Sequence, residues 1–137
     1  MLFFVSKNLT AIGQRVMSSL SGNYSVAYVT VPDQEIGKKI AHGLVNKKLA
    51  ACVNIIPQIT SVYEWKDEIH EDNELLLMIK TRTEVVDALT QYVKENHPYE
   101  VCEVISLPIA NGNEEYLKWI GGNVPSSLVK KEKPSEK

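Results

Sequence analysis

The five consecutive apolar residues from Leu75 to Ile79 limit the possible folds more than any other part of the chain. They belong to a strand-like stretch from Glu74 to Thr81, and successive side chains of a strand point to opposite faces of a sheet. Leu75, Leu77 and Ile79 then lie on one face, and Leu76 and Met78 lie on the other. A strand that is apolar on both sides is buried on both sides. We therefore expect a sheet in which something covers each face.

The residues before this segment predict a strand, a helix and a long second strand. Tyr24 to Val31 alternates and stops at Pro32, which is typical of a strand. Asp33 fits the N-cap of a helix. Its apolar stripe recurs at helical spacing and consists of Ile36, Ile40, Ala41, Leu44 and Val45. Ala50 to Trp65 resembles a long strand interrupted at Pro57, and the polar residues 66–68 favour a turn.

The residues after the central segment predict two more helices and a fourth strand. Thr81 and Glu84 have the spacing of a capping box. An amphipathic helix follows and ends at His97 and Pro98; its apolar residues are Val85, Leu89 and Val93. We expect a strand from Val101 to Leu107. A short last helix is predicted from Glu114 to Ile120, with Gly121 and Gly122 as its stop.

The order strand, helix, strand, strand, helix, strand predicts a ferredoxin-like α+β fold. In this βαββαβ plan, two helices cover one face of a four-stranded antiparallel sheet with the strand order 4-1-3-2. The opposite face would be bare, although the central strand is apolar on that side too. Soluble proteins rarely expose an apolar surface of that size. We infer that other copies of the chain cover it.

Length and charge set further limits. The chain has 137 residues, 44% of them hydrophobic, which suits one domain with a real core. The formal net charge of −2, with both signs interspersed, gives no electrostatic footprint for nucleic acid. No apolar run approaches the roughly 20 residues that cross a bilayer, so we expect no transmembrane segment. We divide the chain into a leader or disordered N-terminus at 1–22, one domain at 23–122 and a disordered polar tail at 123–137.

The leader leaves the localisation open. Residues 1–22 contain no acidic residue, several serines and two bases, Lys7 and Arg15. Such acid-poor leaders are typical of mitochondrial transit peptides, but two positive charges are few. The protein is expected in mitochondria if the leader is a transit peptide and in the cytoplasm otherwise.

Four segments carry a resemblance to a known family. They are Leu49–Asn54, Ser61–Trp65, Ile79–Thr81 and His97–Glu103, the last reading His-Pro-Tyr-Glu-Val-Cys-Glu. Together, and in this order, they resemble the CutA family of divalent-cation-tolerance proteins, in its eukaryotic form, from about Tyr28 to about Trp119. The resemblance implies a homotrimer like that of PII signalling proteins, with three sheets packed around a threefold axis. It also implies a role in metal tolerance.

The segment from His97 to Glu103 contains the candidate metal ligands. Imidazole and thiolate suit Cu, Zn or Ni, and carboxylates widen the range of metals. In bacterial relatives, the resemblance implies copper ligands at the positions of Val29, Asn96 and His97, of which this chain retains one. We therefore expect His97, Cys102 and Glu103 to bind Cu or another divalent metal, with Cys52 in the core. The structural alternative is that His97 only ends and caps its helix.

A second set of residues predicts a ligand cleft. The resemblance places Tyr63, Trp65, Lys80, Tyr99 and Glu100 near the cleft between subunits, where PII-like trimers bind small ligands. A half-buried lysine needs a carboxylate, which Glu100 or Glu64 supplies in this interpretation. Lys80 would then anchor a small anion or metabolite, as in a PII-like sensor. For the aromatic residues, the alternative is simple packing on the sheet.

We expect no enzymatic activity, because the sequence lacks a nucleophile elbow, a phosphate-binding glycine loop and a metalloprotease helix. The function is then either that of a metal-binding trimer or that of a scaffold protein. The resemblance to vertebrate relatives permits a role in the anchoring and processing of acetylcholinesterase. Tight, stoichiometric metal uptake favours the trimer, and a protein partner captured by metal-free protein favours the scaffold.

Overall fold

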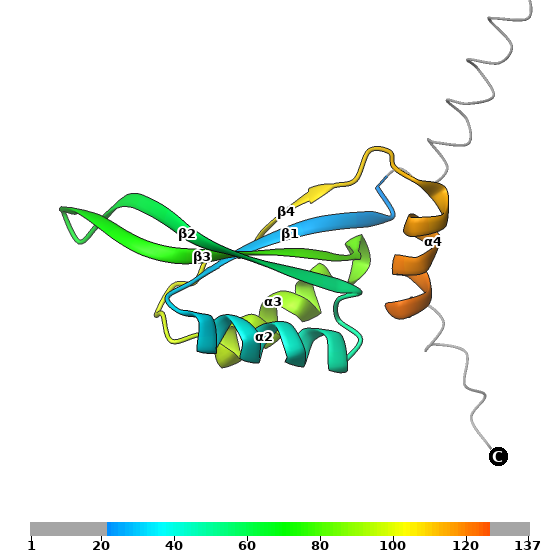
Figure 1. Cartoon of the computed structure of the whole chain (residues 1–137), viewed down its shortest axis with the longest axis horizontal. Coiled ribbons are helices and arrows are strands. Elements are labelled where there is room, and N and C mark those ends of the chain that lie inside the picture. Colours follow the sequence, from blue (N-terminus) through cyan, green and yellow to red (C-terminus); the bar gives the residue numbers. More distant parts are fainter. Residues whose placement is uncertain (1–21, 127–137) are drawn as a thin grey trace, which may run out of the picture.

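The computed structural model describes residues 22–126 and has the predicted ferredoxin-like architecture (Figure 1). The predictions for residues 1–21 and 127–137 lie outside the described residues. The elements are β1 (Tyr24–Val31), α2 (Gln34–Asn46), β2 (Cys52–Trp65), β3 (Glu68–Arg82), a 3-10 turn (Thr83–Val85), α3 (Val86–Asn96), β4 (Ile105–Pro108) and α4 (Glu114–Asn123). The four strands form one antiparallel sheet in the order β2-β3-β1-β4, which is the predicted order.

Helices α2 and α3 lie on one face of the sheet and bury the main core (Figure 1). The strand side chains of this core alternate with residues that point the other way, as the period of two requires. The fully buried set is Ala27, Val29, Val31, Leu77 and Ile79 from the strands, with Ile40, Leu44, Leu89 and Val93 from the helices. Asp33 caps α2 as predicted, because its Oδ1 accepts from the backbone N–H of Ile36 at 2.8 Å.

The predicted capping box of α3 is wrong. Thr81 lies inside β3, and its buried hydroxyl donates to the carbonyl of Leu49 at 2.7 Å. A 3-10 turn from Thr83 to Val85 precedes α3, and its N-cap, Arg82, makes no side-chain capping hydrogen bond. The strand thus extends through residues whose spacing alone suggested a helix start, because the sheet pairs Thr81 with Ser25.

The β2–β3 hairpin extends beyond the helices and is longer than predicted (Figure 1). β3 begins at Glu68, not at Glu74, and pairs with β2 as far as Trp65. Lys66 and Asp67 both have positive φ values, 51° and 64°, as a tight two-residue hairpin turn requires. Residues 68–73 are polar except for the exposed Ile69, so hydrophobic alternation gave no signal for a strand here. The predicted interruption at Pro57 is confirmed by a register shift between Ile56 and Ile59.

The fourth strand is shorter than predicted. β4 contains only Ile105–Pro108 and pairs with β1 between Ser25 and Tyr28. The carbonyl of Thr30, two residues further along β1, accepts from the His97 ring. Residues 97–104 therefore form a loop, and Cys102 lies in this loop and not in an edge strand.

The last helix continues past its predicted stop. α4 includes Gly121 and Gly122 and ends at Asn123. A Cβ atom on Gly121 would lie 2.5 Å from the Tyr24 hydroxyl, so this glycine permits close packing and does not end the helix. Arg82 Nη2 donates to the Gly121 carbonyl at 2.8 Å, and Arg82 Nε donates to the Val124 carbonyl. Val124 is fully buried, so ordered packing extends past residue 123, where we predicted the tail to begin.

The sheet face opposite α2 and α3 is apolar and open in the single chain, as predicted. Tyr28 is cross-strand neighbour to Met78 and to Ile105 on this face. Ile105 and Leu107 of β4 are 55% and 60% exposed. We call this surface the open face and define it by Val26, Tyr28, Leu76, Met78, Ile105 and Leu107. Among residues 22–126, no helix has the length and apolar character to cross a membrane.

Candidate functional site

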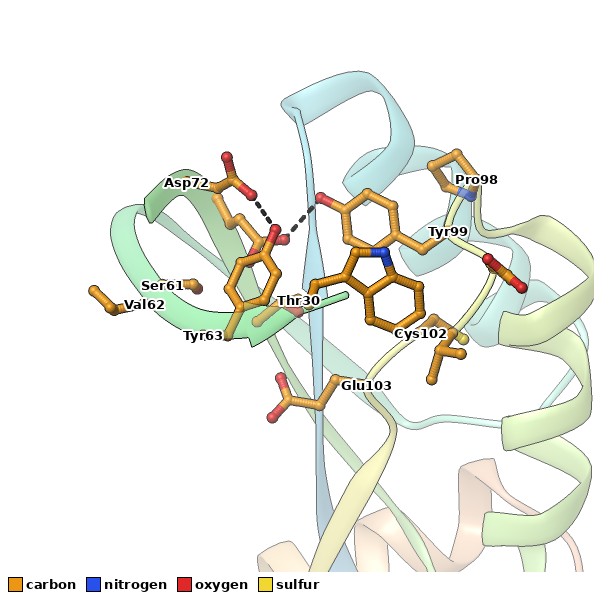
Figure 2. A pocket seen from close by; sticks show the side chains of 13 residues that line it. Thr30, Ser61, Val62, Tyr63, Asp72, Pro98, Tyr99, Cys102 and Glu103 are labelled. Atoms are coloured by element: carbon orange, nitrogen blue, oxygen red, sulfur yellow. Dashed lines mark hydrogen bonds between the residues drawn. The ribbon is translucent and has the colours of Figure 1, made fainter. Parts of the chain in front are cut away.

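A pocket of about 830 Å³ lies where the hairpin meets the loop that follows α3 (Figure 2). Thr30 of β1 also reaches it. The hairpin contributes Ser61, Val62, Tyr63, Trp65, Asp72 and Glu74, and the loop contributes Pro98, Tyr99, Glu100, Val101, Cys102 and Glu103. The pocket therefore joins segments that are far apart in the sequence.

The ionisable groups of the pocket are acidic or neutral. Its carboxylates are Asp72, Glu74, Glu100 and Glu103, and Cys102 adds a thiol. Among the described residues that line it, none is a lysine, an arginine or a histidine. A concave surface lined by one sign of charge concentrates counter-ions, so this pocket favours cations.

The pocket contains two tyrosine–carboxylate pairs, and Figure 2 shows their hydrogen bonds as dashed lines. The Tyr99–Glu74 pair joins the loop to the hairpin, whereas the Tyr63–Asp72 pair lies within the hairpin. The Tyr99 hydroxyl donates to Glu74 Oε2 at 2.9 Å, and Glu74 is only 6% exposed. Burial and this hydrogen bond raise the pKa of Tyr99 well above its ordinary value. The Tyr63 hydroxyl donates to Asp72, and that hydrogen bond raises the Tyr63 pKa. Both phenols therefore remain protonated donors at neutral pH.

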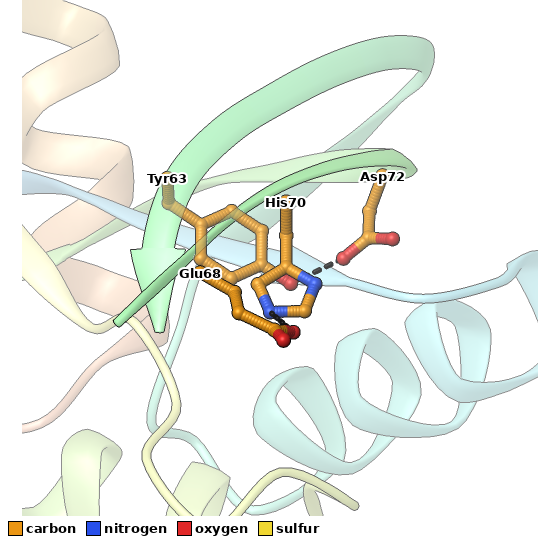
Figure 3. A network of polar contacts seen from close by, with 4 residues as sticks. All are labelled: Tyr63, Glu68, His70 and Asp72. Atoms are coloured by element: carbon orange, nitrogen blue, oxygen red, sulfur yellow. Dashed lines mark hydrogen bonds and ion pairs between the residues drawn. The ribbon is translucent and has the colours of Figure 1, made fainter. Parts of the chain in front are cut away.

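Asp72 and Glu74 were not among the predicted site residues. The signal that could have found them is the alternation of Glu68, His70, Asp72 and Glu74 along one face of β3. Figure 3 shows three members of this row, Glu68, His70 and Asp72, beside Tyr63. The Tyr63 and His70 rings stack at 5.5 Å between centroids, and His70 Nε2 lies 4.0 Å from a Glu68 oxygen. The predicted aromatic packing on the sheet thus occurs together with the polar pair in which Tyr63 donates to Asp72.

His97 is buried and uses both of its ring nitrogens within the chain. Its Nε2 lies 2.7 Å from the Thr30 carbonyl oxygen, and its Nδ1 lies 3.2 Å from the backbone nitrogen of Tyr99. It ends α3 as predicted, with extended backbone before Pro98 (φ −100°, ψ 138°). Its two ring nitrogens, however, are hydrogen-bonded to Thr30 of β1 and to Tyr99, so its side chain does not cap the carbonyls at the end of α3.

The predicted metal set is only partly assembled. Cys102 and Glu103 line the pocket, whereas His97 is not among the lining residues. Within residues 22–126, no group of three His, Cys, Asp or Glu side chains is arranged to hold a metal ion. The described part of one chain therefore supplies suitable donor types but not a complete ligand set.

Of the residues predicted for the ligand cleft, all but Lys80 line the same pocket. Tyr63, Trp65, Tyr99 and Glu100 all line the pocket. The Lys80 ammonium instead donates to the Asn54 side chain and lies 3.9 Å from Cys52 Sγ. The carboxylate partner predicted for Lys80 is thus replaced by an amide and a thiol. Without that lysine, the pocket of the single chain does not have the charge of an anion site.

Cys52 was predicted to lie in the core, and this prediction is wrong. The side chain is half-buried and belongs to neither buried hydrophobic cluster. It lies at the start of the edge strand β2, next to Lys80 and Tyr116. Burial and the nearby thiol raise the pKa of Tyr116.

The family follows from a direct match. Residues 25–123 match the family described as CutA1 divalent ion tolerance protein. The chain belongs to this CutA1 family. It is 65% identical over 108 residues to the CutA homolog of Xenopus laevis, a match that covers 79% of this chain and 72% of the frog protein. It is 57% identical over 99 residues to mouse CutA, covering 72% of this chain and 56% of the mouse protein.

Solved CutA1 structures share the fold. The crystal structure of CutA1 from Oryza sativa aligns with a TM-score of 0.75 and 50% identity, covering 79% of this chain and 99% of the rice chain. The resemblance expected from four short segments is therefore confirmed along the domain. The chain spans little more than half the length of the mouse relative.

Proposed function

We propose that this CutA1 chain binds divalent or copper ions as a homotrimer and so contributes to metal tolerance. The observation that carries the proposal is the pocket, which contains four carboxylates and a thiol but no basic residue among its described lining. The description of the family as a divalent ion tolerance protein supports the same class of ligand.

The donor types in the pocket suit this role. A cysteine thiolate suits Cu or Zn, and carboxylates accept a wider range of divalent ions. Cys102 and Glu103 are the donors on which the proposal rests, and Glu100 lies in the same loop. His97 is left out because its two ring nitrogens are already hydrogen-bonded.

In this proposal the trimer has two roles: it covers the apolar open face, and it completes the metal site. The open face needs cover, and other copies of the chain supply it in this proposal. Thr30 of β1 points to the same side of the sheet as Tyr28 and also lines the pocket, so the pocket borders the open face. Since residues 22–126 of one chain do not arrange three donors close enough to hold an ion, a neighbouring copy would complete the coordination.

Calorimetric titration of the reduced, full-length chain with Zn(II), Cu(II) and Cu(I) tests this proposal. We expect saturable binding of about one ion per subunit, tighter than about micromolar, or roughly −8 kcal/mol. The double variant Cys102→Ser/Glu103→Gln should lose it. The matched control, Cys52→Ser/Glu114→Gln, removes a thiol and a carboxylate outside the pocket and should retain it.

Two outcomes would contradict the proposal. Binding that survives Cys102→Ser/Glu103→Gln would place the ion elsewhere. Absence of binding to any of the three ions would instead favour the scaffold function. Capture of a protein partner by metal-free chain would then be the next measurement.

A further inference from the structure

We propose that His97 is a positioning residue for the pocket: its neutral ring, protonated on Nε2, ties the Tyr99 loop to β1 and so holds Tyr99 against Glu74. The link to ion binding rests on the proposed function. The assignment of the ring and its effect on Tyr99 do not.

The two ring contacts determine where the proton lies. The Thr30 carbonyl can only accept a hydrogen bond, so the nitrogen 2.7 Å from it, Nε2, must carry the hydrogen. The backbone nitrogen of Tyr99 can only donate, so Nδ1, at 3.2 Å, must present a lone pair. A single neutral tautomer satisfies both contacts. His97 as a whole is 8% exposed, so water would not readily replace either partner.

His97 therefore connects three segments. Its Nε2 contacts β1 just beyond the last β4 pair, where β1 has no strand on that side. Its Nδ1 fixes the backbone of Tyr99, and its ring packs at 59° against the Tyr99 ring, with 4.6 Å between centroids. Tyr99 in turn reaches β3 through Glu74.

This chain of contacts ends in the pocket. The loop that His97 ties to β1 carries Tyr99, Glu100, Cys102 and Glu103, all of which line the pocket. If the ring is removed, the loop loses the His97–Thr30 hydrogen bond to β1, and Tyr99 loses the acceptor that orients its backbone. The carboxylates and the thiol remain present but are less well placed. Such supporting contacts commonly change metal affinity by about 10- to 100-fold.

A metal ligand at position 97 would behave differently. Coordination needs a free nitrogen lone pair, and the one on Nδ1 is already hydrogen-bonded to Tyr99. Binding through either nitrogen would break one of the two ring contacts. The positioning role predicts that the ring stays as it is when ions bind.

The first test is the ¹⁵N NMR spectrum of the histidine rings in the full-length chain at neutral pH. A bare ring nitrogen resonates far downfield of a protonated one, so the spectrum reports the tautomer directly. We expect the Nε2–H form for His97, unchanged when Zn(II) is added to saturation. The opposite tautomer, a charged ring, or a change of the His97 nitrogen signals on adding Zn(II) would overturn the proposal.

The second test uses two variants, each of which keeps one of the two hydrogen bonds of the His97 ring. His97→Gln retains a donor for Thr30, and His97→Asn retains an acceptor for the N–H two residues on, as in an Asx-turn. His97→Ala loses both. His42→Ala on the exposed face of α2 is the matched control.

The readout is the titration of Tyr99, followed by its ¹³Cζ signal in tyrosine-labelled protein and assigned with Tyr99→Phe. In His97→Ala we expect the Tyr99 pKa to fall toward its ordinary value, with partial recovery in His97→Asn and no change in His42→Ala. Zn(II) affinity should fall about tenfold in His97→Ala. An unchanged Tyr99 titration in His97→Ala would overturn the proposal. If no ion binds even the unsubstituted chain, the proposed function fails, and the ring spectrum and the Tyr99 titration still decide the role of His97.

Discussion

At the scale of single residues, the pocket depends on pairs in which a phenol donates to a carboxylate. The motif residues Tyr63, Trp65, Tyr99 and Glu100 could be chosen from the sequence, because they lie in the segments that resemble the family. Glu74 was missed: its alternation with Glu68, His70 and Asp72 was the one available signal, and nothing in the sequence indicated its partner, Tyr99, 25 residues away. The contact of His97 with Thr30 could not be predicted either, because it depends on the conformation of the loop that begins at His97.

The Tyr99–Glu74 pair makes stability depend on pH in the alkaline range. The folded state raises the Tyr99 pKa above its unfolded value of about 10, so folding is favoured while the phenol is protonated. This contribution is fully present below pH 10 and is lost as the pH rises toward the folded-state pKa. In urea unfolding between pH 8 and 11, Tyr99→Phe should lose stability less steeply above pH 10 than the unsubstituted chain. Identical slopes would contradict the assignment.

At the scale of elements, hydrophobic periodicity predicted the parts that pack on the core. The bounds of β1 were predicted to the residue, because its alternation is complete and Pro32 ends it. The distal half of β3 was missed, since a strand exposed on both faces has no apolar alternation. The end of α4 was misjudged because glycine also serves close packing, and the neighbours that require it come from β1 and β3.

Gly121 and Gly122 give a matched pair of substitutions in α4. A methyl group on Gly121 meets the Tyr24 hydroxyl and the Arg82 guanidinium, whereas one on Gly122 meets nothing within 4 Å. Gly121→Ala should therefore destabilise the chain by about 1–3 kcal/mol through overpacking. Gly122→Ala should stabilise it by up to about 1 kcal/mol through helix propensity. Urea unfolding at neutral pH measures both, and equal effects at the two positions would contradict the packing described for α4.

At the scale of the whole molecule, the open face and the pocket are neighbouring surfaces, because Thr30 lines the pocket and lies on the same side of the sheet as Tyr28. The apolar character of both faces of β3 was readable from the sequence, and it led to the expectation of covering copies. The donors of the proposed metal site could not be predicted in the same way, because the side chains of the segment from His97 to Glu103 point in different directions. Cys102 and Glu103 reach the pocket, while His97 turns toward β1.

A charge on the open face should separate the copies. Leu107 is 60% exposed in the single chain, so Leu107→Lys leaves the fold of that chain largely intact but places an ammonium in the proposed interface. Sedimentation equilibrium should then show dissociation toward monomers. Val45→Lys on α2, where the residue is 42% exposed on the helical side, should remain trimeric. If the trimer persists in Leu107→Lys but dissociates in Val45→Lys, the interface lies on the helical face, and the proposal that the open face is covered is contradicted.

Native mass spectrometry of the full-length chain with and without Zn(II) tests the central claim most directly, since one spectrum reports both the number of subunits and the number of ions. We expect a trimer with about three bound ions, and an ion-free trimer for Cys102→Ser/Glu103→Gln. A monomer, or a trimer that takes up no ion at Zn(II) concentrations well above micromolar, would contradict the proposal that copies of this chain together hold a metal.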